Sequence, residues 1–319
     1  VYWFRGEGEF GFPDAAKAIL ARKDRSVNVP GLQSRSPLCP AREVDGNTPI
    51  VHLTDLDGIG VPSRRHLPLP LYSRPSSLSA SRGCDQKCYF CSCSTIGGGR
   101  WRRRRPDALA SEVQELVDLL PGETIWLTDD APNLDRSWFL QVIDVFDRFH
   151  DVSWASMVTT AGFDQELAVL MARSGCKVIQ FGVESGNDAV LKHLSKSQSR
   201  SSVIEAVSRA RKAGIAEVSC SLILGHPWDT HDTCTDTIAF GSDLLAAGAT
   251  EVTYGVLTPY PGTPLGDHPD RFGVTIESAD YERYTHSIPV ACTSALTSRD
   301  LRDFLFDAFS KYGFGDSPP

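Results

Sequence analysis

Four cysteines lie within ten residues of one another, in the stretch RGCDQKCYFCSC of residues 82–93. Three of them, Cys84, Cys88 and Cys91, have the spacing C-x3-C-x2-C, and the aromatic Phe90 directly precedes the third. Three thiolates on one tight loop can bind three irons of a 4Fe–4S cube and leave the fourth iron without a protein ligand. An iron that is open in this way can bind a small molecule and help to cleave it.

Zinc binding and disulfide formation are the two alternatives for closely spaced cysteines. Structural zinc sites more often use two separated C-x2-C pairs or mixtures of cysteine and histidine, and neither pattern occurs near this loop. The nine cysteines are odd in number and spread over 319 residues, which disfavours a disulfide scaffold. The spacing therefore favours an iron–sulfur cluster, and Cys93 is left as either a small buried residue or an extra thiol near the cluster.

The composition is that of a soluble enzyme from a reducing compartment, which we expect to be the cytoplasm. Hydrophobic residues make up 41% of the chain and charged residues 23%, as in ordinary globular proteins. The net charge of −8 gives no reason to expect nucleic acid as a partner. No apolar run approaches the roughly 18 residues that a membrane span needs. Because the sequence starts at Val1 and shows no signal peptide, we expect a trimmed chain that lacks an upstream part.

Strand and helix patterns alternate through the middle of the chain. Apolar, β-branched runs predict strands at residues 77–81, 124–128, 152–158, 177–183, 218–224 and 252–257. Amphipathic patterns predict helices between them, at residues 107–120, 135–149, 163–174, 201–213 and 233–247. Six strands with five intervening helices predict a parallel sheet with right-handed crossovers. The fold class is therefore α/β, a partial (β/α)6 TIM-like barrel with extensions at both ends.

The extensions divide the chain into three parts. We expect an N-terminal segment and linker at residues 1–72, the barrel core at residues 73–263 and a C-terminal extension at residues 264–319. Residues 61–75 are rich in proline and predict an extended linker across the barrel face. The C-terminal extension has a helical pattern at residues 296–309 and no second cysteine cluster, which argues against auxiliary iron–sulfur sites.

Polar or glycine-rich segments follow the predicted strands, at the ends where α/β barrels bind their ligands. In chain order they are the cysteine loop, 128–130 (TDD), 182–185 (GVES), 225–227 (GHP) and 258–263 (TPYPGT). Five such ends in succession predict one shared pocket.

These segments resemble, in identity and in order, the motifs of the radical S-adenosylmethionine (radical SAM) superfamily. The resemblance runs from about residue 77 to residue 263. The cysteine loop with Phe90 is similar to the cluster motif, and 182–187 (GVESGN) with 194–196 (LSK) is similar to the "GxESG…L.K" segment. Two further segments agree: 213–215 (AGI) with 222–227 (LILGHP), and 258–264 (TPYPGTP), which resembles the "PyPGTp" of the branch associated with cobalamin.

The resemblance implies which residues bind the cofactors. Cys84, Cys88 and Cys91 would ligate a 4Fe–4S cluster, and its open iron would chelate the amino and carboxylate groups of S-adenosylmethionine. Electron transfer from the cluster then breaks a C–S bond and gives methionine and a 5′-deoxyadenosyl radical. A reductase such as flavodoxin or ferredoxin would donate the electron. Phe90 would lie near the adenine, where an aromatic face is useful.

Four further residues are candidates for binding S-adenosylmethionine. Asp129 and Asp130 occupy the place of the family's "GGE" segment, from which this chain departs, although either carboxylate can accept a hydrogen bond from an ammonium. Glu184 is the candidate for the ribose or the amine, and Ser185 is a weaker candidate of the same kind. No residue is assigned to catalysis, and His226 is expected to be an ordinary loop histidine.

The N-terminal segment resembles the end of the cobalamin-binding region in the cobalamin-associated branch. The similar residues are 5–9 (RGEGE), a short helical pattern after them, and 29–32 (VPGL). The D-x-H-x-x-G loop that holds cobalamin in that branch is not in the sequence. The resemblance therefore suggests a cobalamin-type lineage and points to no residue that would hold this cofactor.

The function implied is radical-initiated modification of a small molecule, with methylation in a biosynthetic pathway as the leading reaction. The alternatives are a radical cyclase or methylthiotransferase-type enzyme, and a truncated, non-catalytic homologue. The arginine run at residues 102–105 is expected to be a solvated charge run or the lip of the pocket, because the whole chain is acidic.

Overall fold

The computed structural model describes residues 2–4, 6–21, 32–34, 50–149, 151–194 and 196–313. Its centre is a parallel sheet whose strand order in space follows the chain, from β3 at one edge to β10 at the other. The strands are β3 (Ser77–Leu78), β6 (Ile125–Leu127), β7 (Trp154–Val158), β8 (Cys176–Glu184), β9 (Glu217–Leu224) and β10 (Glu251–Val256). The predicted parallel sheet is confirmed.

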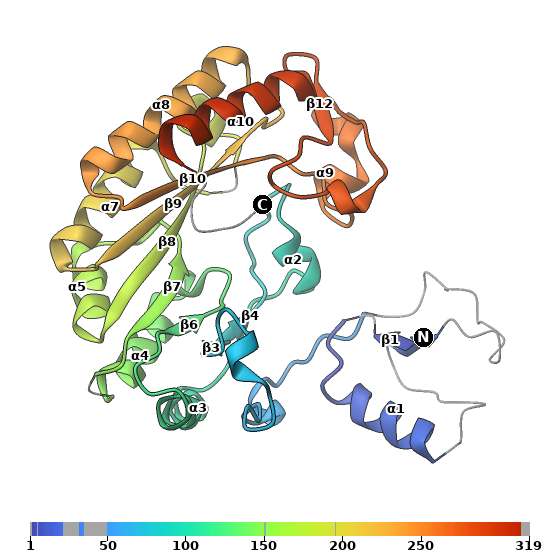
Figure 1. Ribbon diagram of the computed structural model, residues 1–319, viewed down its shortest axis with the longest axis vertical. Coiled ribbons are helices and arrows are strands. Elements are labelled where there is room, and N and C mark those ends of the chain that lie inside the picture. The colour runs from blue at the N-terminus through green and yellow to red at the C-terminus, as the bar shows by residue number, and fades with distance from the viewer. Residues whose placement is uncertain are drawn as a thin grey trace.

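Helices cover the outer face of this sheet, and Figure 1 shows them along the convex side of an arc of strands. They are α3 (Pro106–Leu119), α4 (Arg136–Asp147), α5 (Gln165–Arg173), α7 (Arg200–Ala213) and α8 (His231–Ala247). Because β3 and β10 are the two edges of the sheet, the barrel is open on one side. The predicted α/β class with a partial TIM-like barrel is confirmed.

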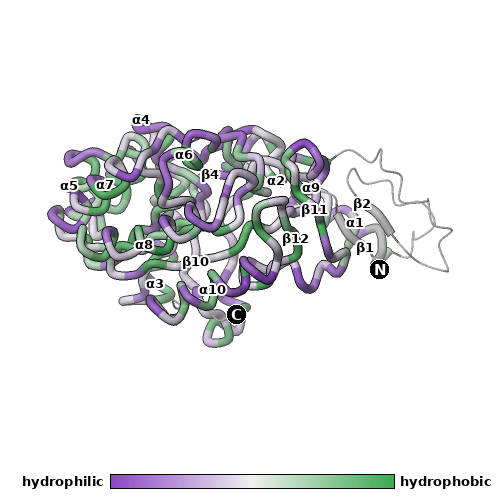
Figure 2. Tube along the Cα trace, turned by 90° about the horizontal axis from the view of Figure 1, so that it is seen from above, coloured by the Kyte–Doolittle hydropathy of each residue, from purple (hydrophilic) through white to green (hydrophobic). Residues whose placement is uncertain are grey.

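The face of the sheet toward the helices is apolar because side chains alternate between the two faces of a strand. Phe181 and Val183 of β8 and Leu222 of β9 are completely or almost completely buried on this side. Trp154 of β7 stacks on Phe146 of α4, with ring centroids 4.8 Å apart. Burial of each such side chain contributes about 1.5–3 kcal/mol to folding, so the core lies between sheet and helices. Figure 2 shows the matching alternation of hydrophobic and hydrophilic segments along α5, α7 and α8.

The opposite, concave face is polar and only half-buried. Gln180 pairs with Ser219, and Ser221 pairs with Thr253, so these four side chains lie on one face of β8, β9 and β10. On β7, Met157 is 46% exposed on the same face. A parallel sheet covered on both faces would be apolar on both. The concave face therefore borders an internal space that can be filled by ligand.

Local chemistry sets the ends of the helices. Ser199 directly precedes α7 and Thr230 directly precedes α8, and each side chain accepts a hydrogen bond from the third residue of its helix in a capping box. Gly214 and Gly248 end the same two helices in the left-handed conformation that glycine adopts without strain. These ends place the loops that lead to β9 and β10.

The N-terminal residues form a small unit beside the barrel. Strand β1 (Tyr2–Phe4) pairs with β2 (Leu32–Ser34), and α1 (Gly11–Leu20) follows the GEGE segment, as the helical pattern predicted. Figure 1 shows α1 apart from the barrel. The linker contains two short 3-10 turns, η1 (Asp57–Ile59) and η2 (Leu69–Leu71). Residues 29–31 of the VPGL segment lie outside the described residues.

The C-terminal extension packs on the last strand of the sheet. Its helix α10 (Ser298–Tyr312) confirms the predicted helix, with its ends moved by two to three residues, and the ring of Tyr312 stacks on Tyr254 of β10 at 5.5 Å. Between them are α9 (Pro264–Asp267), η4 (Pro269–Phe272), β11 (Val274–Ile276), η5 (Tyr281–Arg283) and β12 (Ala291–Thr293). The antiparallel β11–β12 pair was not predicted. Within the described ranges, no helix combines the length and apolar character needed to cross a membrane.

The first predicted strand is wrong in its extent. Residues 77–81 form two separate strands: β3 ends at Leu78, and β4 (Ser81–Arg82) pairs antiparallel with β5 (Arg102–Arg103). The carboxylate of Asp129 accepts a hydrogen bond of 3.0 Å from the amide of Ala80 and another from the Ser81 hydroxyl. These bonds turn the chain out of the sheet before the cysteines.

Candidate active site

The cysteine loop begins and ends at the β4–β5 ribbon, in which Arg82 pairs with Arg102. Gly83 has a φ of 81°, in the left-handed region, and a Cβ placed on Gly97 would lie 2.5 Å from the Cα of Gly83. Only glycine allows two backbone segments to approach so closely. The two glycines therefore close the loop into a ring that keeps its cysteines together.

The three predicted cluster ligands lie on this loop with different surroundings. Cys84 and Cys88 are 8% and 6% exposed, and burial raises the pKa of both thiols, that of Cys88 to about 11. Cys91 is half-buried, and its hydrogen bond with Cys93 lowers its pKa to about 6. No three His, Cys, Asp or Glu side chains of the described ranges converge on a single metal ion. A 4Fe–4S cluster does not need such convergence, because each thiolate binds a different iron. Three thiols on one closed loop suit such a cluster.

Cys93 connects the loop to the end of β6. Its thiol is hydrogen-bonded to Cys91 and to Asp130, and both interactions raise its pKa. The sequence left Cys93 as a spare thiol or a buried residue, and the structure gives it specific partners. A thiol held between a thiolate and a carboxylate orients both of them.

Asp129 and Asp130, which the sequence did not distinguish, have different surroundings. Asp129 is buried and accepts hydrogen bonds from the backbone of Ala80 and from Ser81, so it shapes the turn before the cysteines. Asp130 is half-buried, contacts Cys93 and acts electrostatically on Cys84 and Cys91. Of the two carboxylates, Asp130 is therefore the one that faces the cysteines.

Asp129 should make stability depend on pH. Burial raises its pKa from 3.8 to about 6, partly offset by its hydrogen bonds. Its contribution to stability is present below pH 4 and is lost as the pH rises to about 6, because the unfolded chain releases the proton first. We expect D129N to remove about 2 kcal/mol of this dependence between pH 4.5 and pH 7, measured as the free energy of unfolding at the two pH values. An unchanged pH profile in D129N would contradict this assignment.

Glu184 ends β8 with a backbone φ of 70°, which is rare for a residue other than glycine. Its carboxylate forms an ion pair with Lys196, whose ammonium also lies 3.4 Å from the carbonyl oxygen of Gly182. Burial lowers the pKa of Lys196, but the Glu184 carboxylate more than offsets this, so the pKa is raised and the lysine is charged. Its charge also lowers the pKa of Cys88. The sequence motif contained Lys196, but we assigned it no role.

Ser185 is directed away from the barrel interior. It is completely buried, and its hydroxyl lies 3.2 Å from the hydroxyl of Thr237 on α8. The Thr237 hydroxyl also accepts a bond of 3.0 Å from the amide of Gly186. These contacts connect the end of β8 to α8, so the structure places Ser185 in the support of the strand end.

His226 is not the plain loop histidine that we expected. It is completely buried, and its Nδ1 shares a hydrogen bond of 2.6 Å with the hydroxyl of Tyr89, inside the cysteine loop. Its Nε2 lies 3.4 Å from the carbonyl oxygen of Glu184, which can only accept, so Nδ1 accepts from Tyr89. Burial lowers the pKa of His226 and keeps the ring neutral. The pair therefore ties the cysteine loop to the ends of β8 and β9.

Aromatic rings surround this connection. The Tyr89 ring stacks on Phe272 at 5.1 Å and contacts Trp228 edge-on at 5.3 Å. Phe90 is half-buried and lies edge-on to Tyr89 at 5.1 Å and to His226 at 5.7 Å. Such edge-on pairs are favourable arrangements for aromatic rings. Phe90 is thus held beside the cysteines with part of its surface still accessible.

The arginine run, expected to be a solvated charge run or the lip of the pocket, is solvated only at Arg103 and Arg105. Arg102 and Arg104 are largely buried, and Arg102 pairs with Glu7 of the GEGE segment. Glu7 also accepts a bond of 3.0 Å from Arg82, so one carboxylate lies between the two opposed arginines of the β4–β5 ribbon. Two like charges directly across a ribbon would repel without it. Arg103 and Arg105 are exposed and pair with Asp135 and Asp57.

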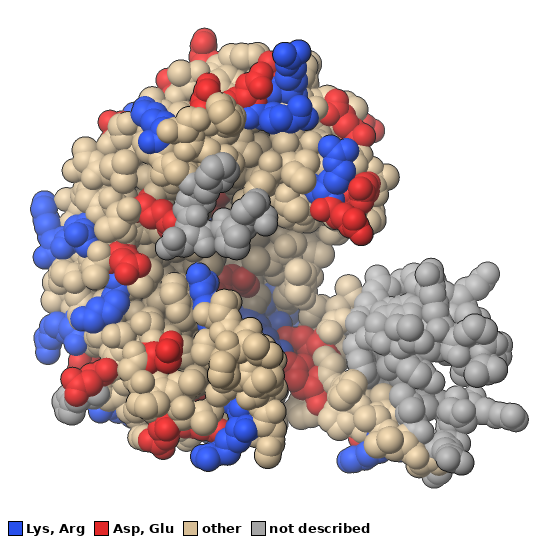
Figure 3. Space-filling view, in the orientation of Figure 1, with Lys and Arg blue, Asp and Glu red and all other residues tan. Residues whose placement is uncertain are grey.

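A cavity of about 330 Å³ lies on the concave face and reaches Glu184. Gln180, Ser221, Thr253 and His286 supply polar groups to its wall. Figure 3 shows this side of the molecule hollowed near its centre, with acidic and basic side chains interspersed around it. The cavity has the size of a small-ligand site, and Glu184 connects it to the cysteine loop through Lys196.

Comparison with known proteins gives one consistent result. The profile of the Radical SAM superfamily matches residues 78–241, half of the chain. An uncharacterized methyltransferase of Pyrococcus horikoshii is 27% identical over an alignment of 316 residues that covers 97% of this chain and 66% of that protein. The anaerobic magnesium-protoporphyrin IX monomethyl ester cyclase of Cereibacter sphaeroides is 24% identical, over 97% of this chain and 50% of the cyclase.

A solved structure has the same fold. It is the radical S-adenosylmethionine methyltransferase TsrM from Kitasatospora setae with cobalamin and a 4Fe–4S cluster bound, and it aligns with a TM-score of 0.70 at 20% identity. The alignment covers 88% of this chain and 56% of TsrM. This chain therefore spans between half and two thirds of the length of these three proteins.

Proposed function

Because the chain belongs to the radical SAM superfamily, we propose that it reductively cleaves S-adenosylmethionine and uses the resulting radical to modify a small molecule, with methylation as the leading reaction. One observation carries this proposal. The closed cysteine loop is anchored, through Tyr89 and His226, at the carboxyl ends of β8 and β9, next to the Lys196–Glu184 pair. This is the end of an α/β barrel at which ligands bind.

In this proposal Cys84, Cys88 and Cys91 hold a 4Fe–4S cluster. When bound, the cluster supplies the electron that breaks a C–S bond of S-adenosylmethionine and releases a 5′-deoxyadenosyl radical. Lys196 balances the negative charge of the thiolates, since its ammonium already acts electrostatically on Cys88. Phe90 lies beside the loop with accessible surface and would contact the adenine.

The remaining residues would bind the polar groups of S-adenosylmethionine. Asp130 faces the cysteines and would accept hydrogen bonds from the ammonium group. Glu184 would accept from the ribose or the amine, with Lys196 orienting its carboxylate. We assign Asp129 and Ser185 to the support of this site, because both are buried and bonded to neighbouring elements.

The substrate would lie along the concave face. Gln180, Ser221 and Thr253 can donate and accept hydrogen bonds there, in a cavity of about 330 Å³ that also includes Glu184. A cavity of this volume suits a small molecule. The relatives named as methyltransferases support methyl transfer as the reaction.

Cobalamin is a further cofactor in this proposal, supported by the GEGE and PYPGT segments and by its presence in TsrM. The described residues do not single out a group that would hold it. We also propose that the chain has three parts: an N-terminal segment and linker at residues 1–72, the radical SAM core at residues 73–263, and a C-terminal extension at residues 264–319.

A flavodoxin or ferredoxin would supply the electron. A reduced iron–sulfur cluster and such a donor need a reducing compartment, so we place the reaction in the cytoplasm. Nucleic acid is not the proposed substrate, because the arginine run is engaged in ion pairs with Glu7, Glu112, Asp135 and Asp57.

A radical cyclase is the second candidate, favoured by the 97% of this chain that aligns with the cyclase of Cereibacter sphaeroides. A methyltransferase adds a methyl group from S-adenosylmethionine to its product, whereas a cyclase adds no methyl group. Transfer of label from S-adenosyl-[methyl-14C]methionine to a candidate substrate separates the two.

The test of radical formation is anaerobic reconstitution with iron and sulfide, followed by reduction in the presence of S-adenosylmethionine. We expect 5′-deoxyadenosine to form. We expect D130N to raise the KM for S-adenosylmethionine about tenfold while its iron content is unchanged, as for one lost hydrogen bond to a charged group. D85N is the matched control, since Asp85 is an exposed carboxylate of the same loop.

Absence of 5′-deoxyadenosine from the reconstituted protein would refute the proposed activity and favour a non-catalytic homologue. Equal effects of D130N and D85N on the KM would refute the role of Asp130 and leave the activity intact.

A further inference from the structure

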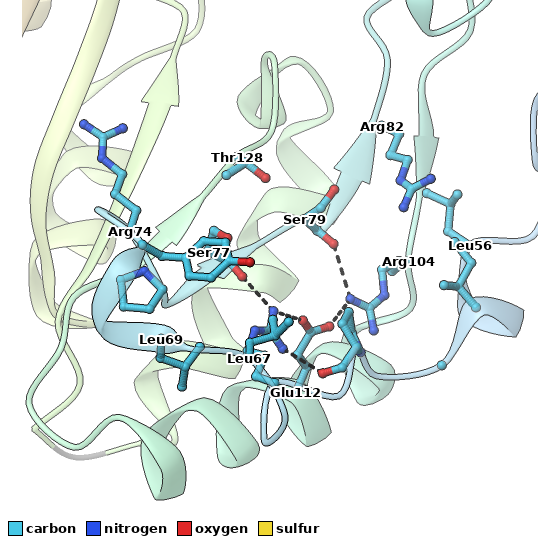
Figure 4. Close-up of a pocket in the computed structure, with 16 residues that line it drawn as sticks. Leu56, Leu67, Leu69, Arg74, Ser77, Ser79, Arg82, Arg104, Glu112 and Thr128 are labelled. Atoms are coloured by element: carbon cyan, nitrogen blue, oxygen red, sulfur yellow. Dashed lines mark hydrogen bonds and ion pairs between the residues drawn. The ribbon is translucent and has the colours of Figure 1, made fainter. Parts of the chain in front are cut away.

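A second cavity, also of about 330 Å³, lies at the β3 edge of the sheet, away from Glu184. Figure 4 shows its two kinds of wall: polar side chains of the strand ends, such as Ser77 and Thr128, and apolar side chains of the linker, such as Leu67 and Leu69. Ser77 pairs with Trp126 across β3 and β6. The cavity therefore lies where the linker meets the first strands of the barrel.

Two arginines share one carboxylate at the bottom of this cavity. Arg64 lies 2.6 Å from one oxygen of Glu112 and Arg104 lies 2.5 Å from the other. All three residues are buried, at 7%, 8% and 1% exposed, and Figure 4 shows the guanidinium of Arg104 beside the carboxylate of Glu112. Two positive charges against one negative charge leave an excess of one positive charge in a buried position.

Backbone oxygens reduce the cost of this charge but do not neutralise it. Arg64 donates to the carbonyl of Ser77 at 2.7 Å, and Arg104 donates to the carbonyl of Ser79 at 3.3 Å. A buried charge without an opposite charge is unfavourable even when it is hydrogen-bonded. A guanidinium group is also well suited to bind a carboxylate or a phosphate. An anion in the cavity would supply the missing charge.

A second unbalanced cation lies at the rim. The guanidinium of Arg74 is stacked 3.9 Å above the ring of Trp126, and Arg74 has no ion pair within the described part of the chain. Arg82, the fourth arginine of the lining, pairs with Glu7 and Glu9 and adds no net charge. Glu112 is the one carboxylate among the described lining residues, so the cavity as a whole is positive.

We propose that this cavity binds a small amphipathic molecule that carries one anionic group, a carboxylate or a phosphate, on an apolar body. The anionic group lies by Arg74, the lining arginine without an ion pair among the described residues, and the apolar body lies against Leu67 and Leu69 on the same side of the cavity. The further statement that this molecule is the substrate, held by its anionic group beside the concave face, rests on the proposed function. The binding of an anionic, amphipathic molecule in the cavity does not rest on it.

The test compares two fluorescent probes that share the same aromatic skeleton and differ in charge. The first, 8-anilinonaphthalene-1-sulfonate, carries one anionic group, and the second, N-phenyl-1-naphthylamine, lacks it. We expect the anionic probe to bind the full chain about tenfold more tightly, the difference made by one hydrogen bond to a charged group. The R74Q variant should bind the anionic probe about tenfold more weakly than the wild-type chain and should bind the neutral probe with unchanged affinity. R103Q is the matched control, since Arg103 pairs with Asp135 and does not line the cavity.

Location is tested by L67W, which fills the apolar side and should weaken both probes. Competition by sodium acetate and by inorganic phosphate then shows which anion the site prefers. Equal affinity for the two probes, or equal losses in R74Q and R103Q, would overturn the proposal. The measurement uses neither iron nor S-adenosylmethionine, so its outcome is independent of whether the chain forms 5′-deoxyadenosine.

Discussion

Replacing Cys88 with alanine will remove cluster binding, and with it all detectable formation of 5′-deoxyadenosine. Two thiolates cannot hold three irons of a cube, and Cys88 is the most enclosed of the three proposed ligands, at 6% exposed. It is also the thiol whose pKa is raised to about 11 by burial, so metal binding must displace its proton. We expect a loss of at least about a thousandfold in activity, with iron and sulfide contents close to zero.

Cys93→Ala is the control for this experiment. Cys93 is on the same loop and is bonded to Cys91 and Asp130, but the C-x3-C-x2-C spacing does not include it. C93A should keep its iron, with activity reduced about tenfold or less, because it loses hydrogen bonds to Cys91 and Asp130 but no proposed cluster ligand. If C88A retained iron, or if C93A lost as much iron as C88A, the assignment of the three ligands would be wrong.

Glu112→Ala will cost about 3–5 kcal/mol in the free energy of unfolding, the largest stability effect that we expect from a single polar residue of this chain. The substitution leaves Arg64 and Arg104 buried without any carboxylate between them. These three residues connect the linker, β5 and α3, so the loss should also loosen the linker from the barrel. Chemical denaturation followed by circular dichroism measures the change.

Glu115→Ala is the matched control, because it removes a glutamate from the same helix with the same change in helix propensity. It has no ion pair within the described residues, and we expect a change of about 0.5 kcal/mol or less. Equal effects of E112A and E115A would show that the buried arginines do not depend on Glu112. Since Glu112 also sets the charge of the second cavity, E112A should bind the anionic probe at least as tightly as the wild-type chain where it remains folded.

Much of the fold could be predicted from local sequence. The strands from β6 to β10 are runs of apolar residues between turn residues, and α3, α4, α5, α7 and α8 have periodic apolar faces. These patterns depend only on residues close together in the sequence. They can therefore be recognised without knowing which helices and strands pack against one another. The first strand was predicted too long because the bonds from Asp129, 48 to 49 residues away along the chain, end it. No local pattern carries that information.

The candidate site divides in the same way. Spacing alone identified Cys84, Cys88 and Cys91, because three ligands on one short loop are close together in any fold. Spacing could not tell Asp129 from Asp130, since adjacent residues point in different directions and only packing decides which one is buried. His226 had no signal of its own, because its partner Tyr89 is 137 residues away along the chain.

By itself, therefore, the sequence determined the cysteine loop, the alternating elements and the family to which they belong. The tertiary structure alone decided which charges are compensated. It placed Glu7 between Arg82 and Arg102, Lys196 on Glu184, and a single carboxylate between Arg64 and Arg104. The reason is physical: periodicity and ligand spacing act over a few residues, whereas burial of a charge depends on whatever the fold brings against it.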